Sequence, residues 1–150
     1  MEIQRLVDQL NRSFSRNAWH GPAVMEILSD VSAKQAAARP IPNAHSIWEI
    51  VQHIASWNSI VERRLRGNTV NETTAEDWPP VRETSVPAWQ KTQAALQQAH
   101  ETLVQTILQM SDPQLETKAP GQDTSIYVML HGLIQHDLYH AGQISLLKKF

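Results

Sequence analysis

The sequence predicts an all-α protein, a four-helix bundle. Four long segments carry apolar residues at helical spacing, strand-like alternation is nearly absent, and the segments are bounded by residues that start or stop helices. The chain has 150 residues, of which 41 % are apolar and 19 % charged, which suits a single globular domain over residues 1–150. Four long helices with one long crossover connection are typical of a four-helix bundle.

The first long helix is expected over residues 2–15. Its apolar residues recur at intervals of three and four: Ile3, Leu6, Val7, Leu10 and Phe14. A short helical piece is expected over residues 21–28 in the first connection. Pro22 would lie in its first turn, where proline is well tolerated.

The second long helix is the best marked. Ser46 and Glu49 have the spacing of a capping box, in which the serine caps the helix start and the glutamate reaches back. Gly67 is a natural stop. Between them runs an apolar stripe: Ile47, Ile50, Val51, Ile54, Trp57, Val61 and Leu65. The basic residues near its end suit the helix dipole, so they are interpreted as helix-end charges rather than as a binding patch.

A long loop over residues 68–84, with Pro79 and Pro80, separates the second helix from the third. Loops of this length are often functional or mobile, so it either covers a site or only connects helices. The third helix should begin near Ser85 or Pro87 and run to Met110, because proline at position 113 disfavours a helical residue before it. The fourth is expected over residues 125–148.

The composition excludes several classes of function. The formal net charge of −2 gives no general attraction to nucleic acid or to an anionic membrane surface. The chain contains no cysteine, so disulfides, thiolate nucleophiles and thiolate metal sites are excluded. No signal peptide and no apolar stretch of about 18 residues is present, so a cytoplasmic protein is expected.

Two of the three histidines of the fourth helix fall on its apolar face. On a wheel of about 100° per residue that starts at Ile126, the buried face is marked by Ile144 at about 0°. His136 falls at about 280° and His140 at about 320°, inside that face, whereas His131 falls at about 140° on the far side. Residues at i and i+4 are neighbours, so two imidazoles here can reach one metal ion.

A pair of ligands binds weakly, so a third is expected upstream. The motif differs by one residue from the zinc-protease pattern His-Glu-x-x-His, but that pattern needs a downstream ligand for which too little chain follows. His53 is the best upstream candidate, because it lies at the edge of the apolar stripe of the second helix. The other histidines lack this placement: His20 in the first connection, His45 in a loop and His100 near the polar side of the third helix.

Spacing alone leaves two interpretations open. A single histidine on an apolar face is usually a core residue that one hydrogen bond satisfies. Two histidines at i and i+4 on that face are harder to satisfy, since each needs polar partners. A metal site and simple core packing therefore both remain at this point.

The two histidine-bearing segments resemble the DinB/YfiT-like metalloenzyme superfamily. One segment runs from residue 46 to 57 around His53, and the other from residue 136 to 144 with Tyr139, His140, Gly142 and Gln143. The likeness extends to residues 19–22 and 77–79, and so covers most of the chain. It implies an up-down-down-up four-helix bundle, often dimeric, with a divalent metal, commonly zinc or nickel, held by three histidines.

Carried over by position, the metal ligands are His53, His136 and His140. Relatives include thiol S-transferases that use a low-molecular-weight thiol and a thiol-dependent isomerase, while many members have no established activity. Three neutral imidazoles leave a divalent ion its full charge and an open position, as in catalytic sites. Such an ion acidifies a water, for hydrolysis, or a thiol, for transfer to an electrophile. With no cysteine in the chain, the thiol must be a small molecule.

Several residues near these ligands also receive a predicted role. Asp137, in the apolar stripe, is the candidate catalytic residue, as a proton acceptor or by orienting a ligand; the alternative is a buried carboxylate bonded to a neighbouring helix. Tyr139 is placed at a helix interface, and Gln143 near His136 or a substrate. Trp48, Trp57, Trp78 and Trp89 are interpreted as core or pocket walls.

Three functional hypotheses follow. The first is a metal-dependent transferase or hydrolase acting on a small-molecule substrate. The second is a non-catalytic metal- or ligand-binding module, which is dimeric. The third is a helical scaffold whose histidines only pack. Metal removal separates them, because it should abolish turnover, loosen the ligand or dimer, or change nothing.

Overall fold

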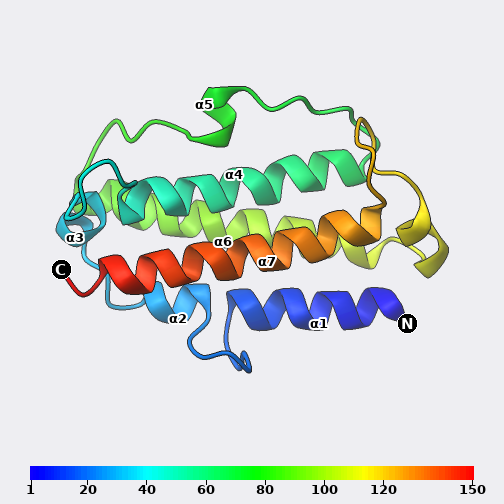
Figure 1. Ribbon diagram of the computed structural model, residues 1–150, viewed down its shortest axis with the longest axis horizontal. Helices are drawn as coiled ribbons and strands as arrows, with labels where there is room; N and C mark the ends of the chain where they lie inside the picture. The colour runs from blue at the N-terminus through cyan, green and yellow to red at the C-terminus, as the bar shows by residue number, and fades with distance from the viewer.

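The structure is a computed structural model that describes residues 1–150. Its regular secondary structure is entirely helical, apart from one isolated bridge between Lys118 and Ser125 (Figure 1). Four helices are long and four are short. The long ones are α1 (Glu2–Phe14), α4 (Ile47–Leu65), α6 (Val86–Leu108) and α7 (Ile126–Leu147). The short ones are α2 (Val24–Leu28), α3 (Ala33–Ala37), α5 (Thr74–Asp77) and the 3-10 helix η1 (Asp112–Glu116). None has the length and apolarity needed to cross a membrane.

The four long helices confirm the predicted elements, with ends that differ by one or two residues. The Ser46 hydroxyl accepts from the Glu49 N–H, and the Glu49 carboxylate accepts from the Ser46 N–H, so the capping box forms as expected. Gly67 ends α4 with a φ of +92°. The short piece expected from residue 21 begins only at Val24, because Glu26 caps the Ala23 N–H, and the proline lies before the helix.

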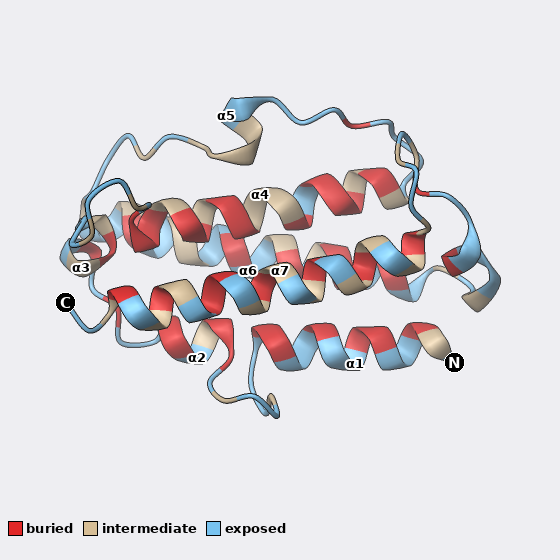
Figure 2. Ribbon diagram, in the orientation of Figure 1, coloured by how far each residue is buried: buried red, intermediate tan, exposed pale blue.

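Each long helix packs against two of the other three. Both α4 and α1 contact α6 and α7, while α1 and α4 do not contact each other. Figure 2 shows buried residues on the inward faces of all four helices. Because every long helix has two long neighbours, it buries residues on two sides, and not along a single apolar stripe alone.

The core has two apolar clusters and a few buried polar side chains outside them. One cluster joins α2, α3, the start of α4, the first half of α6 and the end of α7, and includes Trp48, Trp89 and Leu96. The other joins α1, η1, the second half of α6 and the start of α7, with Val61 of α4. His100 was expected near the polar side of its helix, and this is wrong. It is only 3 % exposed, because α1 covers it: its ring stacks on Phe14 at 3.8 Å.

The crossover between α4 and α6 contains the unpredicted helix α5, which lies against α4 (Figure 1). Its N-cap is Thr73, whose hydroxyl accepts from the Glu76 N–H. The Glu76 carboxylate accepts from Arg63 of α4 at 3.1 Å, and the Ser56 hydroxyl donates to the Glu76 carbonyl. These contacts fix the segment that follows, Asp77 and Trp78, over the middle of α4.

Candidate metal centre

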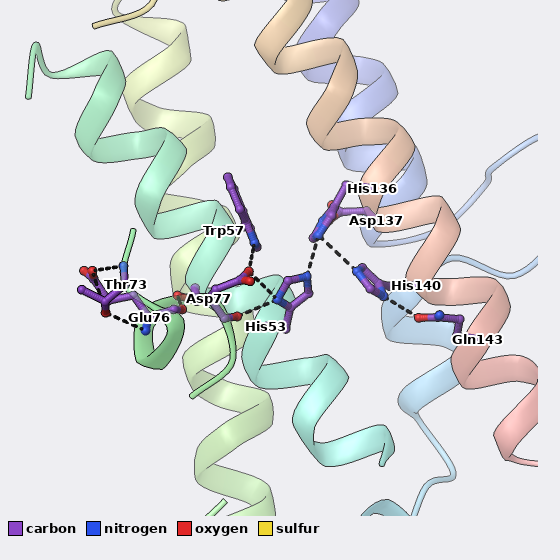
Figure 3. Close-up of polar contacts among 10 residues, drawn as sticks. His53, Trp57, Thr73, Glu76, Asp77, His136, Asp137, His140 and Gln143 are labelled. Atoms are coloured by element: carbon purple, nitrogen blue, oxygen red, sulfur yellow. Dashed lines mark hydrogen bonds and ion pairs between the residues drawn. The ribbon is translucent and has the colours of Figure 1, made fainter. Parts of the chain in front are cut away.

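Three histidines from two helices meet between α4 and α7 (Figure 3). The Nε2 atom of His136 lies 2.9 Å from Nε2 of His53 and 3.1 Å from Nε2 of His140. One ligand nitrogen from each ring lies within 4.8 Å of the other two. The structure thus brings together the three histidines that the sequence singled out, and no other histidine joins them.

His53 is held by the crossover. Its Nδ1–H donates to the Asp77 carbonyl at 2.6 Å, and since a carbonyl can only accept, Nε2 carries the lone pair. The indole of Trp78 stacks on the His53 ring at 3.9 Å, and the His45 ring stacks on that indole at 3.6 Å. The loop that was expected either to cover a site or merely to connect helices therefore covers His53.

His136 and His140 lie one turn apart on α7. The His140 Nδ1–H donates to Oε1 of Gln143 at 2.6 Å, which again leaves the lone pair on Nε2. Burial lowers the pKa of both His136 and His140 to about 4, and it also lowers the pKa of His53. All three imidazoles are therefore neutral near pH 7, which is the form that binds metal ions.

The protein atoms alone cannot satisfy this arrangement, and a cation can. The Nε2 atoms of His53 and His140 are both acceptors, and both face Nε2 of His136. That atom can donate at most one proton, so it cannot satisfy both. Imidazole nitrogens that share one tetrahedral cation at about 2.0–2.1 Å lie about 3.3 Å apart. The Nε2–Nε2 distances of 2.9 and 3.1 Å are a few tenths of an ångström shorter than this, so small movements of the rings would admit a divalent ion. The donor set fits a metal.

Asp137 is fully buried beside this cluster. Burial raises the pKa of its carboxyl to about 8, so it holds a proton at neutral pH. Its Oδ1 lies 3.7 Å from Nδ1 of His136, too far for a hydrogen bond. Neither carboxyl oxygen of Asp137 nor Nδ1 of His136 has a hydrogen-bond partner. The alternative interpretation of Asp137, a buried carboxylate bonded to a neighbouring helix, required a hydrogen bond that is absent. The carboxyl therefore lies, in its protonated form, next to the His136 ring.

The other neighbours refine the sequence interpretation. Gln143 contacts His140 and not His136, because the i to i+3 spacing places them together. Tyr139 is 67 % exposed, so within this chain it lies at no helix interface. Trp48 is buried in the core, whereas Trp57 lies near the rings of His53 and His136 and donates to Oδ1 of Asp77 at 2.8 Å.

The crossover contacts were missed at the sequence level. Neither the carbonyl of Asp77 nor the stacking of Trp78 was foreseen. One signal was available: Thr73 and Glu76 have capping-box spacing, which predicts a helix start inside the loop. That start fixes where the following two residues lie.

Two cavities lie along α4. The larger, of about 960 Å³, is lined by α4, α6 and the crossover, and none of the three clustered histidines lines it. The smaller, of about 180 Å³, lies between α4 and α7 and includes His136 in its wall. The smaller cavity is therefore the one that adjoins the histidine cluster.

Comparison with known proteins agrees with the site. The family model described as the DinB superfamily matches residues 16–144, which include all three clustered histidines. No curated protein and no solved structure matches the chain.

Proposed function

The chain belongs to the DinB superfamily, and from that premise we propose that it is a metal-dependent enzyme that activates a thiol or a water. His53, His136 and His140 would hold one divalent cation. The observation that carries the proposal is the convergence of three neutral Nε2 atoms, at 2.9 and 3.1 Å, with no protein group that satisfies all of them.

The bound cation would supply Lewis acidity that lowers the pKa of a thiol or water in the site. The protein supplies the rest. The Asp77 carbonyl and Gln143 fix the tautomers of two ligand rings, and the indoles of Trp57 and Trp78 shield the rings from water. Asp137 is protonated at neutral pH, and its Oδ1 lies 3.7 Å from Nδ1 of His136, so a small shift would let a proton pass to or from that ring.

We propose zinc or nickel as the metal, because imidazole ligands suit both ions. In the transferase form of the reaction, a low-molecular-weight thiol adds to an electrophilic substrate. The hydrolase form uses water in its place. Since the chain has no cysteine, a thiol nucleophile would have to be a cosubstrate.

We further propose that the four long helices form an up-down-down-up bundle. Two observations support it: the contacts of α1 and α4 with both α6 and α7, and a crossover long enough to return the chain to the start of α4 before α6 begins (Figure 1). Exposed apolar side chains on α7, at Val128, Tyr139 and Leu146, support a homodimer. Light scattering on the purified protein would measure the assembly directly.

The first experiment is the metal content of purified, tag-free protein by elemental mass spectrometry. We expect about one zinc or nickel per chain in the wild type. His136→Ala should lose the metal and His131→Ala should keep it, because His131 lies outside the cluster. If no metal appears after addition of zinc, nickel, manganese or iron, or if both variants keep it equally, the proposal fails.

Activity assays then separate the two forms. Turnover that depends on added thiol, and that is lost with the metal, identifies a transferase. Turnover of an ester or amide without thiol identifies a hydrolase. Metal binding with neither activity would favour the non-catalytic binding module.

A further inference from the structure

The outward face of α7 carries no aspartate, glutamate, lysine or arginine. Asp137 is the only such residue in the helix, and its side chain is fully buried. The exposed face of α1, by contrast, carries Arg5, Asp8 and Arg12. A helix without charges on any face is normally buried on all sides. The outward face of α7 therefore calls for a partner that the chain itself does not supply.

The exposed residues of α7 form one continuous stripe. They follow one another at intervals of four, three, four, three and four: Val128, Gly132, Gln135, Tyr139, Gly142 and Leu146. Alternating intervals of three and four are the spacing of the seam between two helices that pack side by side. Val128, Tyr139 and Leu146 are 53 %, 67 % and 54 % exposed, so the stripe presents three large apolar side chains to solvent.

This stripe is complementary to itself when two copies run antiparallel. Its centre is position 137, and every residue of the stripe has a counterpart equally far on the other side of that position. A two-fold axis at this level pairs residues of one copy with residues of the other: Val128 with Leu146, Gly132 with Gly142 and Gln135 with Tyr139. All six residues of both copies are then buried at one seam, as a symmetric interface requires. A shift by one heptad in either direction leaves two of them without a counterpart.

The two glycines of the stripe suit a close approach of two helices. A Cβ added at Gly132 or Gly142 would meet no atom within 4 Å in the same chain. Glycine disfavours a helix interior, and packing within the chain does not require it at either position. In the antiparallel pair these two positions face each other, so the backbones can come close together and leave room for the rings of Tyr139 beside them.

We propose that α7 forms the interface of the homodimer by packing antiparallel against α7 of a second copy, with the two-fold axis at the level of residue 137. The interface then adjoins the histidine centre of each copy. Tyr139, whose ring lies 5.2 Å from that of His140, and Gly132, which lines the cavity beside His136, both belong to the stripe. This assignment rests on the homodimer proposed above, and it does not require a bound metal.

Introduced cysteines test the register, because the chain has none of its own. The double variant Val128→Cys/Leu146→Cys places thiols of the two copies opposite each other at both ends of the seam, so mild oxidation should give covalent dimers. Each single variant should give almost none. The two copies of either position lie about 27 Å apart along the helix axis, at about 1.5 Å per residue, whereas a disulfide needs Cα atoms within about 7 Å.

Light scattering at a series of protein concentrations measures the strength of the dimer. Tyr139→Glu should raise its dissociation constant about a hundredfold or more, because each copy would bury an unpaired charge at the seam. Val86→Glu is the matched control, since Val86 is 60 % exposed on α6, outside the stripe. This variant should dimerise like the wild type, within about twofold. Thermal unfolding of each variant verifies that it is folded.

The outcomes separate the interface from the homodimer and from the metal site. A monomeric wild type refutes the homodimer and the interface together, whatever its zinc content. If the wild type is a dimer that Tyr139→Glu leaves intact, or that the paired cysteines do not cross-link, only the interface is refuted. Efficient cross-linking of Val128→Cys alone would show parallel helices and refute the antiparallel register. Zinc content is measured on the same samples, and its absence would refute the metal site while the interface stands.

Discussion

Gln143 orients the ring of His140 through a single contact, so replacing it by leucine isolates the effect of ligand orientation on metal binding. The contact is 2.6 Å long and lies within one turn of α7. Leucine has a similar size and an equally good helix propensity, so the helix itself should be unaffected. Without the acceptor, the ring can rotate or carry its proton on Nε2, and Nε2 is then not available to a metal in the cluster.

The expected loss is about 10- to 100-fold in metal affinity, the range found when a partner that orients a ligand histidine is removed. This corresponds to about 1.4–2.7 kcal/mol. The loss of one neutral hydrogen bond alone would account for about 1 kcal/mol, and the freed ring for the remainder. The other two ligands keep their contacts, so binding should weaken but not disappear.

The assay is a zinc titration in competition with a chromophoric chelator. Gln135→Leu is the matched control, because Gln135 is exposed on the same helix. Gln143→Glu tests the opposite change. A carboxylate accepts the hydrogen bond from His140 more strongly than an amide, so the affinity for zinc should be kept or raised. If Gln143→Leu binds zinc within twofold of the wild type, while His136→Ala still loses it, the orienting role of Gln143 is refuted.

Three further predictions concern stability, each measured by denaturant unfolding of metal-free protein. Burial lowers the folded-state pKa of His100 from 6.5 to about 4, so the unfolded chain binds more protons between these values and stability falls as the pH drops through them. His100→Gln should remove about 1 kcal/mol of the loss between about pH 7.5 and 5.5, and an unchanged pH dependence would contradict this. Ser46→Ala should cost about 1–2 kcal/mol through the lost cap, against no resolvable cost for the exposed Ser59→Ala. Leu96→Ala, at a fully buried position, should lower the free energy of unfolding by about 2–5 kcal/mol. Its control Leu108→Ala, at 43 % exposure on the same helix, should lower it by about 0.5 kcal/mol or less. Equal losses for Ser46→Ala and Ser59→Ala, or for the two leucine variants, would contradict the corresponding prediction.

The long helices could be predicted because their signals are local. Ser46 and Glu49 start α4 by contacts within one turn, and apolar spacing marks the inward face of each helix. The short helices α3 and α5 have five and four residues, too few for a periodic pattern. His100 was misplaced for another reason: a wheel gives one stripe, and α6 is covered on two sides.

The ligand trio could be predicted only in part from the residues themselves. Spacing on α7 places His136 and His140 together, the edge of the apolar stripe on α4 made His53 the best third candidate, and the family resemblance then gave all three as ligands. The residues that contact and orient these histidines could not be predicted. The Asp77 carbonyl and the Trp78 ring reach His53 because α5 is anchored to Arg63 by Glu76, and such contacts between distant segments leave no pattern in one sequence.

The position of the ligands along the chain has a consequence for biosynthesis. His53 precedes His136 by 83 residues. At about 5–20 residues per second, the ribosome needs several seconds to add that length, during which α4 carries one isolated ligand. The trio is complete only once α7 has emerged and docked. If the trio binds a metal as proposed, the nascent chain could not hold it tightly, and the ion would be chosen from those available to the folded protein.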